Sequence, residues 1–99
     1  MIEAVLANRI GRIPLNRPAV HNSLDRKAMR DIRKVLLDWA DAPISVLVVT
    51  GIGKSFCSGV SLGDVGSGDW SENPLTAVCD ALENFHAPTI CALNGGVYG

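Results

Sequence analysis

The sequence predicts an α/β fold in which at least some of the strands run parallel. An apolar stripe at helical spacing covers residues 24–39, and an apolar, β-branched run at 44–49 follows it. A second helical pattern at 74–86 is again followed by an apolar run, at 89–93. Strands that alternate with helices are typical of parallel α/β arrangements, because a parallel pair needs a crossover connection.

The first two predicted strands are short. Residues 3–8 predict one strand and residues 10–15 a second, and we expect Gly11 to break the two apart. Pro14 has no N–H to donate to a neighbouring strand, which favours an edge or an interrupted strand.

The strongest helix signal begins at Leu24. Apolar residues recur from there at spacings of mostly three and four, which places one stripe along a helix of about four turns. Ser23 is the expected N-cap, and Asp41-Ala42-Pro43 is expected to end the helix. The stripe consists of Leu24, Ala28, Met29, Ile32, Val35, Leu36 and Trp39.

The second half of the chain predicts two more strands and a helix. The run 44–49 predicts a strand buried on both faces. Residues 59–73, rich in Gly, Ser and Asp, predict a mobile loop or lid. Pro74 is expected to open the second helix, Pro88 to end it, and residues 89–93 to form a second buried strand.

Composition limits the function classes. The 99 residues allow one small domain, and 47% hydrophobic residues indicate a rich core or an apolar surface that takes a partner. A net charge of −1 gives no sign of a nucleic-acid or anionic-membrane partner. The basic cluster lies among acidic residues on the first helix, which predicts a solvated face. Its members are Arg26, Lys27, Arg30, Arg33 and Lys34.

The N-terminus and the cysteines predict a cytoplasmic protein. Met1-Ile2-Glu3 lacks the basic start of a secretory signal, and no apolar run is long enough to span a membrane. The three cysteines are odd in number and not in CxxC spacing, so we expect reduced, buried thiols. With His21 and His86 they offer no recognisable zinc spacing, and no metal is expected. The cysteines are Cys57, Cys79 and Cys91.

Gly53-Lys54-Ser55 raises the alternative of a nucleotide phosphate loop. That loop requires a glycine at position 48, where the sequence has Val48, and a helix directly afterwards. The dinucleotide pattern G-x-G-x-x-G fails at Phe56. Both patterns are therefore disfavoured, and the glycines need another explanation.

Three segments together resemble the N-terminal part of the crotonase superfamily, the enoyl-CoA hydratase/isomerase family. They are "IPLNRPAVHNSL", "VLVVTGIGKSFCSGVSL" and "PTICALNGGVYG", in the family's order and spacing. The resemblance implies a ClpP/crotonase-type spiral of ββα units, assembled as trimers or as hexamers made of two trimers. Members are longer, so residues 1–99 are expected to be the N-terminal part of one domain.

The resemblance also implies a use for the glycines. Crotonase chemistry acts on acyl-CoA thioesters, and two backbone N–H groups stabilise the negative charge on the thioester oxygen as an enolate forms. By motif position the first donor is the N–H of Val60, after Gly59. The second belongs to a residue following the position of Gly99. No metal or redox cofactor is implied, only acyl-CoA as substrate.

A groove for the pantetheine and adenine portions of CoA is implied around two backbone segments. In this groove His21 could contribute its backbone only, Ser58 could satisfy a turn and Leu62 could simply pack. Ser61 replaces the family's aspartate, which puts the local turn geometry in question. The implied groove residues are Val20, His21, Ser23, Ser58, Gly59, Val60, Ser61 and Leu62.

The resemblance assigns no acid–base residue to this sequence. The two glutamates that activate water in similar hydratases follow the region where the sequence ends, so the isolated chain is expected to be inactive. The alternative from another class is a non-catalytic module that oligomerises or complements a C-terminal chain. Other crotonase-fold reactions remain open, whereas a Cys57 nucleophile with His21 or His86 is disfavoured, because Cys57 occupies a position that commonly holds a small packing residue.

Overall fold

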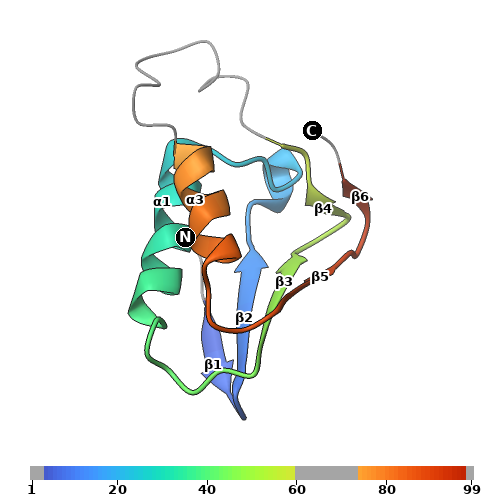
Figure 1. Cartoon of the computed structure of the whole chain (residues 1–99). Coiled ribbons are helices and arrows are strands. Elements are labelled where there is room, and N and C mark those ends of the chain that lie inside the picture. The colour runs from blue at the N-terminus through green and yellow to red at the C-terminus, as the bar shows by residue number, and fades with distance from the viewer. Residues whose placement is uncertain (1–3, 60–73, 98–99) are drawn as a thin grey trace.

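The computed structural model describes residues 4–59 and 74–97, which form a sheet with two helices beside it (Figure 1). The sheet has four strands in the order β1-β2-β3-β5. A second, two-stranded sheet joins β4 to β6. The strands are β1 Val5–Ala7, β2 Ile10–Leu15, β3 Val46–Gly51, β4 Ser55–Cys57, β5 Thr89–Ala92 and β6 Gly96–Val97.

The first two strands form a hairpin, and the rest of the main sheet is parallel. β1 pairs antiparallel with β2, whereas β2 with β3 and β3 with β5 pair in parallel. The expected break at Gly11 is wrong: Gly11 lies inside β2, opposite Leu6. The chain reverses instead at Asn8 and Arg9, both in the left-handed region at φ 53° and 64°, as a two-residue hairpin turn requires.

Pro14 lies inside the sheet, not at its edge. β2 stands between β1 and β3, and Pro14 pairs with Thr50 of β3. On the other side the pairing with β1 ends at Arg12, opposite Val5. Among the described residues none of β1 pairs with Pro14, which has no N–H to donate.

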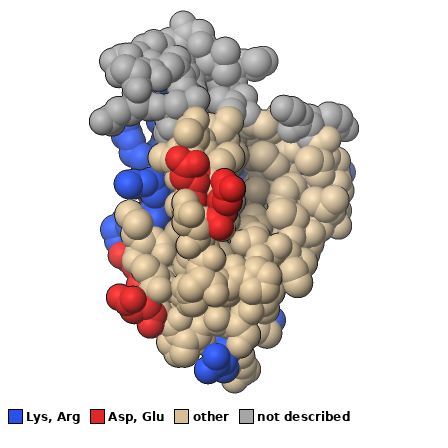
Figure 2. All heavy atoms as spheres, in the orientation of Figure 1, with Lys and Arg blue, Asp and Glu red and all other residues tan. Residues whose placement is uncertain are grey.

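The first helix, α1 (Arg26–Asp38), follows a 3-10 turn, η1 (Pro18–Val20). Its N-cap is Asp25, whose carboxylate accepts from the Ala28 N–H at 2.7 Å, so the expected cap at Ser23 is wrong by two residues. The predicted basic face is confirmed: Lys27 and Lys34 make exposed pairs with acidic residues one turn on. Figure 2 shows several basic side chains along the side of the molecule on which α1 lies in Figure 1.

The core lies between the main sheet and the two helices. Ile13 and Leu47 are fully buried, and they belong to one cluster with Met29 of α1 and Val78 of α3 (Pro74–Glu83). Alternate residues of β2 are buried, at Gly11, Ile13 and Leu15, because successive side chains of a strand point to opposite faces.

The expectations of a strand buried on both faces at 44–49 and of a second buried strand at 89–93 are wrong. β3 is half-buried along most of its length, and all four residues of β5 are exposed. Among the described strands, β5 is hydrogen-bonded to β3 alone. Among the described residues no helix is long and apolar enough to cross a membrane.

Candidate functional site

The tight turn between β3 and β4 lies at the centre of the candidate site. A Cβ atom on Gly51 would lie 2.5 Å from the Ser55 carbonyl oxygen, so only glycine allows this approach. Gly53 lies in the left-handed region, at φ 93°. Ser55 then begins a strand, where a phosphate loop would begin a helix. The turn therefore leads the chain from β3 into β4. The argument against a phosphate loop is confirmed.

Asn22 joins this turn to the segment that precedes α1. Its side chain is 1% exposed. The amide nitrogen donates to the carbonyls of Ile52, at 3.0 Å, and Ser55, at 2.8 Å. The amide oxygen accepts from the Arg17 N–H at 2.7 Å. Both donors and the acceptor of this buried side chain are therefore satisfied.

Further bonds extend this contact along residues 17–24 and 52–59, which together we name the clasp. The Leu24 N–H donates to the Gly59 carbonyl at 2.8 Å. The Ser58 hydroxyl donates to the Val20 carbonyl at 3.4 Å. The clasp thus brings together two segments whose side-chain bonds span 30 to 38 residues of the sequence.

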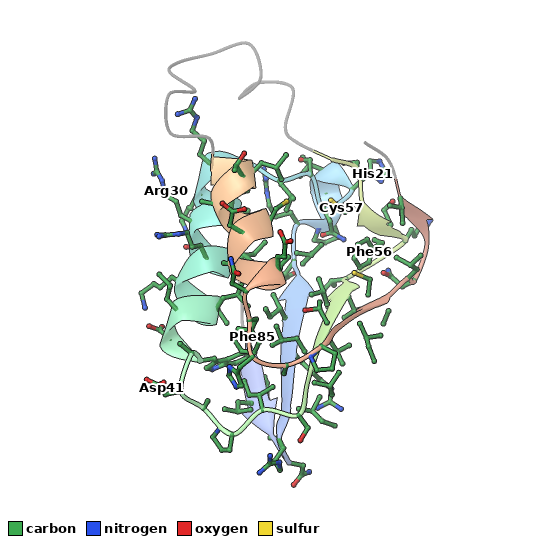
Figure 3. All side chains as sticks on the ribbon, viewed as in Figure 1. His21, Arg30, Asp41, Phe56, Cys57 and Phe85 are labelled. Carbon is green, nitrogen blue, oxygen red and sulfur yellow. The ribbon has the colours of Figure 1, made fainter. Side chains whose placement is uncertain are left out.

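The backbone of the clasp has a positive φ at four positions, of which Gly53 is described above. His21 and Asn22 lie in the left-handed region, at φ 53° and 56°, and Gly59 lies there at φ 94°. Glycine adopts this conformation freely, whereas asparagine and histidine adopt it more often than most other residues but against the steric cost of a Cβ atom. His21 is exposed, and its Nδ1 lies 3.2 Å from the Ser55 hydroxyl. Figure 3 shows His21 near Phe56 and Cys57, at the β4 end of the molecule.

A second asparagine holds the turn from the side of β5. The amide oxygen of Asn94 accepts from the Gly51 N–H at 3.1 Å. Its amide nitrogen donates to the carbonyls of Gly53, at 2.9 Å, and Ser55, at 3.3 Å. A Cβ atom on Gly95 would collide with the Lys54 carbonyl. Asn22 and Asn94 thus converge on the Ser55 carbonyl at the start of β4.

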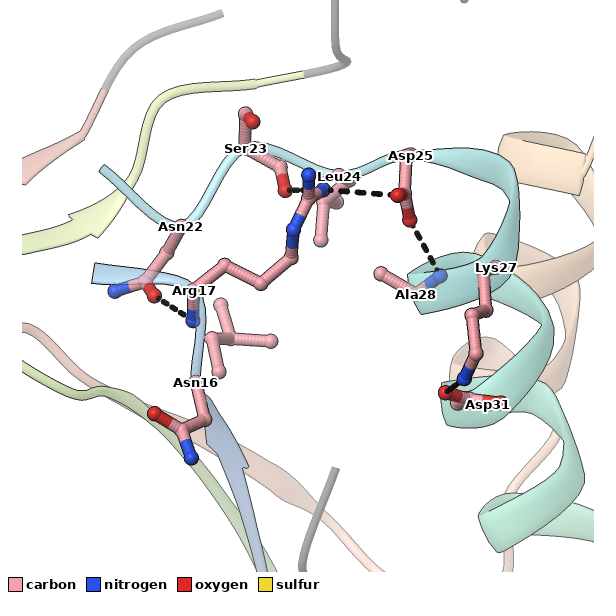
Figure 4. A pocket seen from close by; sticks show the side chains of 10 residues that line it. Asn16, Arg17, Asn22, Ser23, Leu24, Asp25, Lys27, Ala28 and Asp31 are labelled. Atoms are coloured by element: carbon pink, nitrogen blue, oxygen red, sulfur yellow. Dashed lines mark hydrogen bonds and ion pairs between the residues drawn. The ribbon is translucent and has the colours of Figure 1, made fainter. Parts of the chain in front are cut away.

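A small cavity of about 140 Å³ lies between the clasp and α1 (Figure 4). Its charged side chains pair with one another: Arg17 lies 3.4 Å from Asp25, and Lys27 lies 2.8 Å from Asp31. Arg17 also donates to the Ser23 carbonyl at 2.6 Å. The two cations and two anions that line the cavity therefore sum to no net charge.

The structure brings together the implied groove residues that it describes. Val20 contacts Ser58, and Gly59 bonds to Leu24, next to Ser23. Val60, Ser61 and Leu62 lie outside the described residues, as does most of the loop expected at 59–73. Sequence reasoning missed Asn22 and Asn94. The signal that could have found them is the presence of these asparagines in two of the segments that carry the family resemblance, "IPLNRPAVHNSL" and "PTICALNGGVYG".

The expectation of buried thiols is wrong. Cys79 and Cys91 are exposed, and Cys57 is half-buried with its sulfur 3.4 Å from the Gly59 nitrogen. Within residues 4–59 and 74–97 no three His, Cys, Asp or Glu side chains gather as metal ligands.

A family model described as enoyl-CoA hydratase/isomerase matches residues 6–99. The chain belongs to the enoyl-CoA hydratase/isomerase family. Among curated relatives of this family, the protein named probable enoyl-CoA hydratase 1, peroxisomal, of Arabidopsis thaliana is 40% identical over 90 residues, which are 87% of this chain and 34% of that one. A probable enoyl-CoA hydratase of Mycobacterium tuberculosis is 31% identical over 96 residues, with 91% of this chain and 38% of that one covered.

Solved structures confirm the α/β crotonase-type fold. An enoyl-CoA hydratase from Mycobacterium marinum superimposes with a TM-score of 0.83 at 30% identity, over 95% of this chain and 48% of that one. An enoyl-CoA hydratase from Bacillus anthracis gives a TM-score of 0.79 at 27% identity, over 95% and 40%. The chain thus spans less than half the length of these family members.

Proposed function

We propose that these 99 residues bind the thioester end of an acyl-CoA molecule, as part of an enoyl-CoA hydratase/isomerase-family site. In this proposal the N–H of Val60 donates to the thioester oxygen, and the backbone of the clasp lines the groove for CoA. The observation that carries the proposal is the 2.8 Å bond from Leu24 to the Gly59 carbonyl, because it joins the two implied groove segments beside the proposed donor.

A single backbone N–H donor can contribute to the binding of acyl-CoA, but it is not sufficient for hydration. A hydrogen bond to a polarised carbonyl contributes a net free energy of about 0.5–1.5 kcal/mol, whereas hydration also requires a second donor and an acid–base pair. None of the carboxylates matches an implied catalytic position in the sequence. We therefore propose that a polypeptide of these 99 residues binds acyl-CoA without hydrating it.

The test measures binding and turnover on the same 99-residue polypeptide. Titration calorimetry with crotonyl-CoA is expected to show saturable binding. A crotonyl-CoA hydration assay is expected to give no rate above buffer, with a full-length hydratase of the family as the positive control. Absence of binding would refute the site, and turnover near that of the control enzyme would refute the proposed inactivity.

One observation favours a second candidate, a non-catalytic module that associates with itself or with a complementary chain. Ile90, Leu93 and Val97 are 54%, 63% and 51% exposed, and β3 is the one described strand that pairs with β5. Figure 2 shows that much of the surface on this side carries neither basic nor acidic side chains. Sedimentation of the purified polypeptide tests this candidate, and a stable monomer that binds no apolar dye would contradict it.

A further inference from the structure

The dipeptide Asn94-Gly95 is chemically reactive in an unfolded chain. Asn94 is the one asparagine in the sequence that is followed by glycine. The backbone nitrogen that follows an asparagine can attack the carbon of the side-chain amide, and glycine hinders this attack least because it has no Cβ atom. Both residues are exposed in the structure. Burial therefore does not keep water away from this pair.

The turn between β3 and β4 requires both residues of the pair. The residue after Asn94 must be glycine, because a Cβ atom on Gly95 would collide with the Lys54 carbonyl. The Asn94 side chain must offer both a donor and an acceptor, which an ionised carboxylate does not. Its partners are three backbone groups, the Gly51 N–H and the carbonyls of Gly53 and Ser55.

The same three hydrogen bonds oppose the reaction while the turn is folded. For the Gly95 nitrogen to form a bond to the side-chain carbon of Asn94, the amide group must leave its three partners on the β3–β4 turn. These partners lie more than 35 residues away in the sequence, so they are present only when the two segments are docked. The protection of Asn94 therefore comes from folding and not from burial.

We propose that Asn94 is a site of spontaneous deamidation, and that the folded turn holds this reaction back. Hydroxide removes the proton of the Gly95 N–H, and the nitrogen forms a bond to the side-chain carbon of Asn94. The amide group takes up a proton and leaves as ammonia. Water then opens the resulting cyclic imide, to aspartate or to isoaspartate. The inference does not depend on the proposed function.

Either product removes the donor on which the turn depends. In the aspartate product, a carboxylate oxygen replaces the nitrogen that now lies 2.9 Å from the Gly53 carbonyl and 3.3 Å from the Ser55 carbonyl. Oxygen atoms that only accept cannot bond to one another. The isoaspartate product also lengthens the backbone by one carbon, beside the close contact of Gly95 with Lys54. A chain that reacts while unfolded is therefore expected to rebuild the turn poorly.

The first test measures deamidation of the 99-residue polypeptide at mildly alkaline pH, in buffer and in concentrated guanidinium chloride. Peptide mapping by mass spectrometry follows position 94. The reaction is expected to be at least about tenfold slower in buffer, because it requires local opening of the turn. In guanidinium chloride, Gly95→Ala is expected to slow the reaction, and the folding of this variant does not matter there. Equal rates in the two solvents would refute the protection, and no reaction at Asn94 in guanidinium chloride would refute the site.

The second test measures what the product does to stability. Asn94→Asp carries the product side chain on an ordinary backbone, and it is expected to lower the ratio of folded to unfolded protein about tenfold. Asn8→Asp is the matched control, because Asn8 is also exposed and lies in a turn, at a positive φ that aspartate tolerates. Its ratio is expected to change about twofold or less.

Guanidinium chloride denaturation, followed by circular dichroism, compares the two variants with the unsubstituted polypeptide. Failure of Asn94→Asp to fold, while Asn8→Asp folds, would support the loss of the turn. Equal effects of the two substitutions would show that the product does not damage the turn, and would refute that consequence.

Discussion

At the scale of single residues, the left-handed backbone at His21 is a source of strain that can be tested. His21 has φ 53° and is exposed. Its neighbour Asn22 has the same backbone conformation but gains three hydrogen bonds from it. The turn is therefore stabilised by Asn22, and His21 takes up the conformation that this requires.

This strain predicts different stabilities for two variants at position 21. His21→Gly is expected to be more stable than His21→Ala by about 1 kcal/mol, because glycine adopts a positive φ without the steric penalty of a Cβ atom. Both variants lack the imidazole, so the comparison removes its contact with Ser55. Urea denaturation measures the difference, and equal midpoints with equal slopes would contradict the assignment of strain.

At the residue scale, the sequence did not predict the long-range hydrogen bonds of Asn22. His21 and Ser23 were recognisable from the sequence as implied groove residues. The hydrogen bonds of Asn22 to Ile52 and Ser55 were not, because they span 30 and 33 residues. Local sequence patterns indicate a residue's own conformation. The hydrogen bonds of Asn22 depend instead on which distant backbone segment lies beside it in the fold.

At the scale of elements, Gly11 allows a helix and a strand to pack closely. A Cβ atom on Gly11 would lie 2.6 Å from the ring of Trp39 and 3.0 Å from a methyl group of Leu47. Trp39 is the C-cap of α1. The glycine that the sequence suggested as a strand break is therefore a contact site for the end of the helix.

Adding a methyl group at this contact is expected to destabilise the fold. Gly11→Ala should lower the free energy of unfolding by about 1–3 kcal/mol, as overpacking does. The exposed neighbour Arg12→Ala should change it by about 0.5 kcal/mol or less. Because the smaller ring of Trp39→Phe makes room, the double variant should recover part of the loss. Strictly additive effects in urea denaturation would show that Trp39 does not oppose the added methyl group.

The elements were largely predictable from the sequence, and their exposure was not. The periodicity from Leu24 and the proline at position 74 gave both helices, and the apolar runs gave β3 and β5. The same runs suggested burial on both faces, which is wrong for β5. Apolar content shows that a strand prefers to be covered, but neighbouring elements decide whether it is.

At the scale of the whole molecule, the apolar surface around β5 predicts concentration-dependent association. Ile90→Lys places a charge on the exposed strand and is expected to shift the polypeptide toward monomer, because charged residues on an edge strand oppose pairing. Leu37→Lys, which alters a similarly exposed residue on α1, is the control and should leave association unchanged. Sedimentation velocity at several concentrations measures both. Identical behaviour of the two variants would exclude β5 as the contact.

The order of strands in the main sheet has a consequence for biosynthesis. Because the order β1-β2-β3-β5 is also the order along the chain, each strand that leaves the ribosome finds its partner already made. The hairpin can form first, and β3 joins it once α1 has emerged, followed by β5 after α3. Assembly can therefore proceed in the direction of translation, without waiting for a late segment to be inserted between earlier ones.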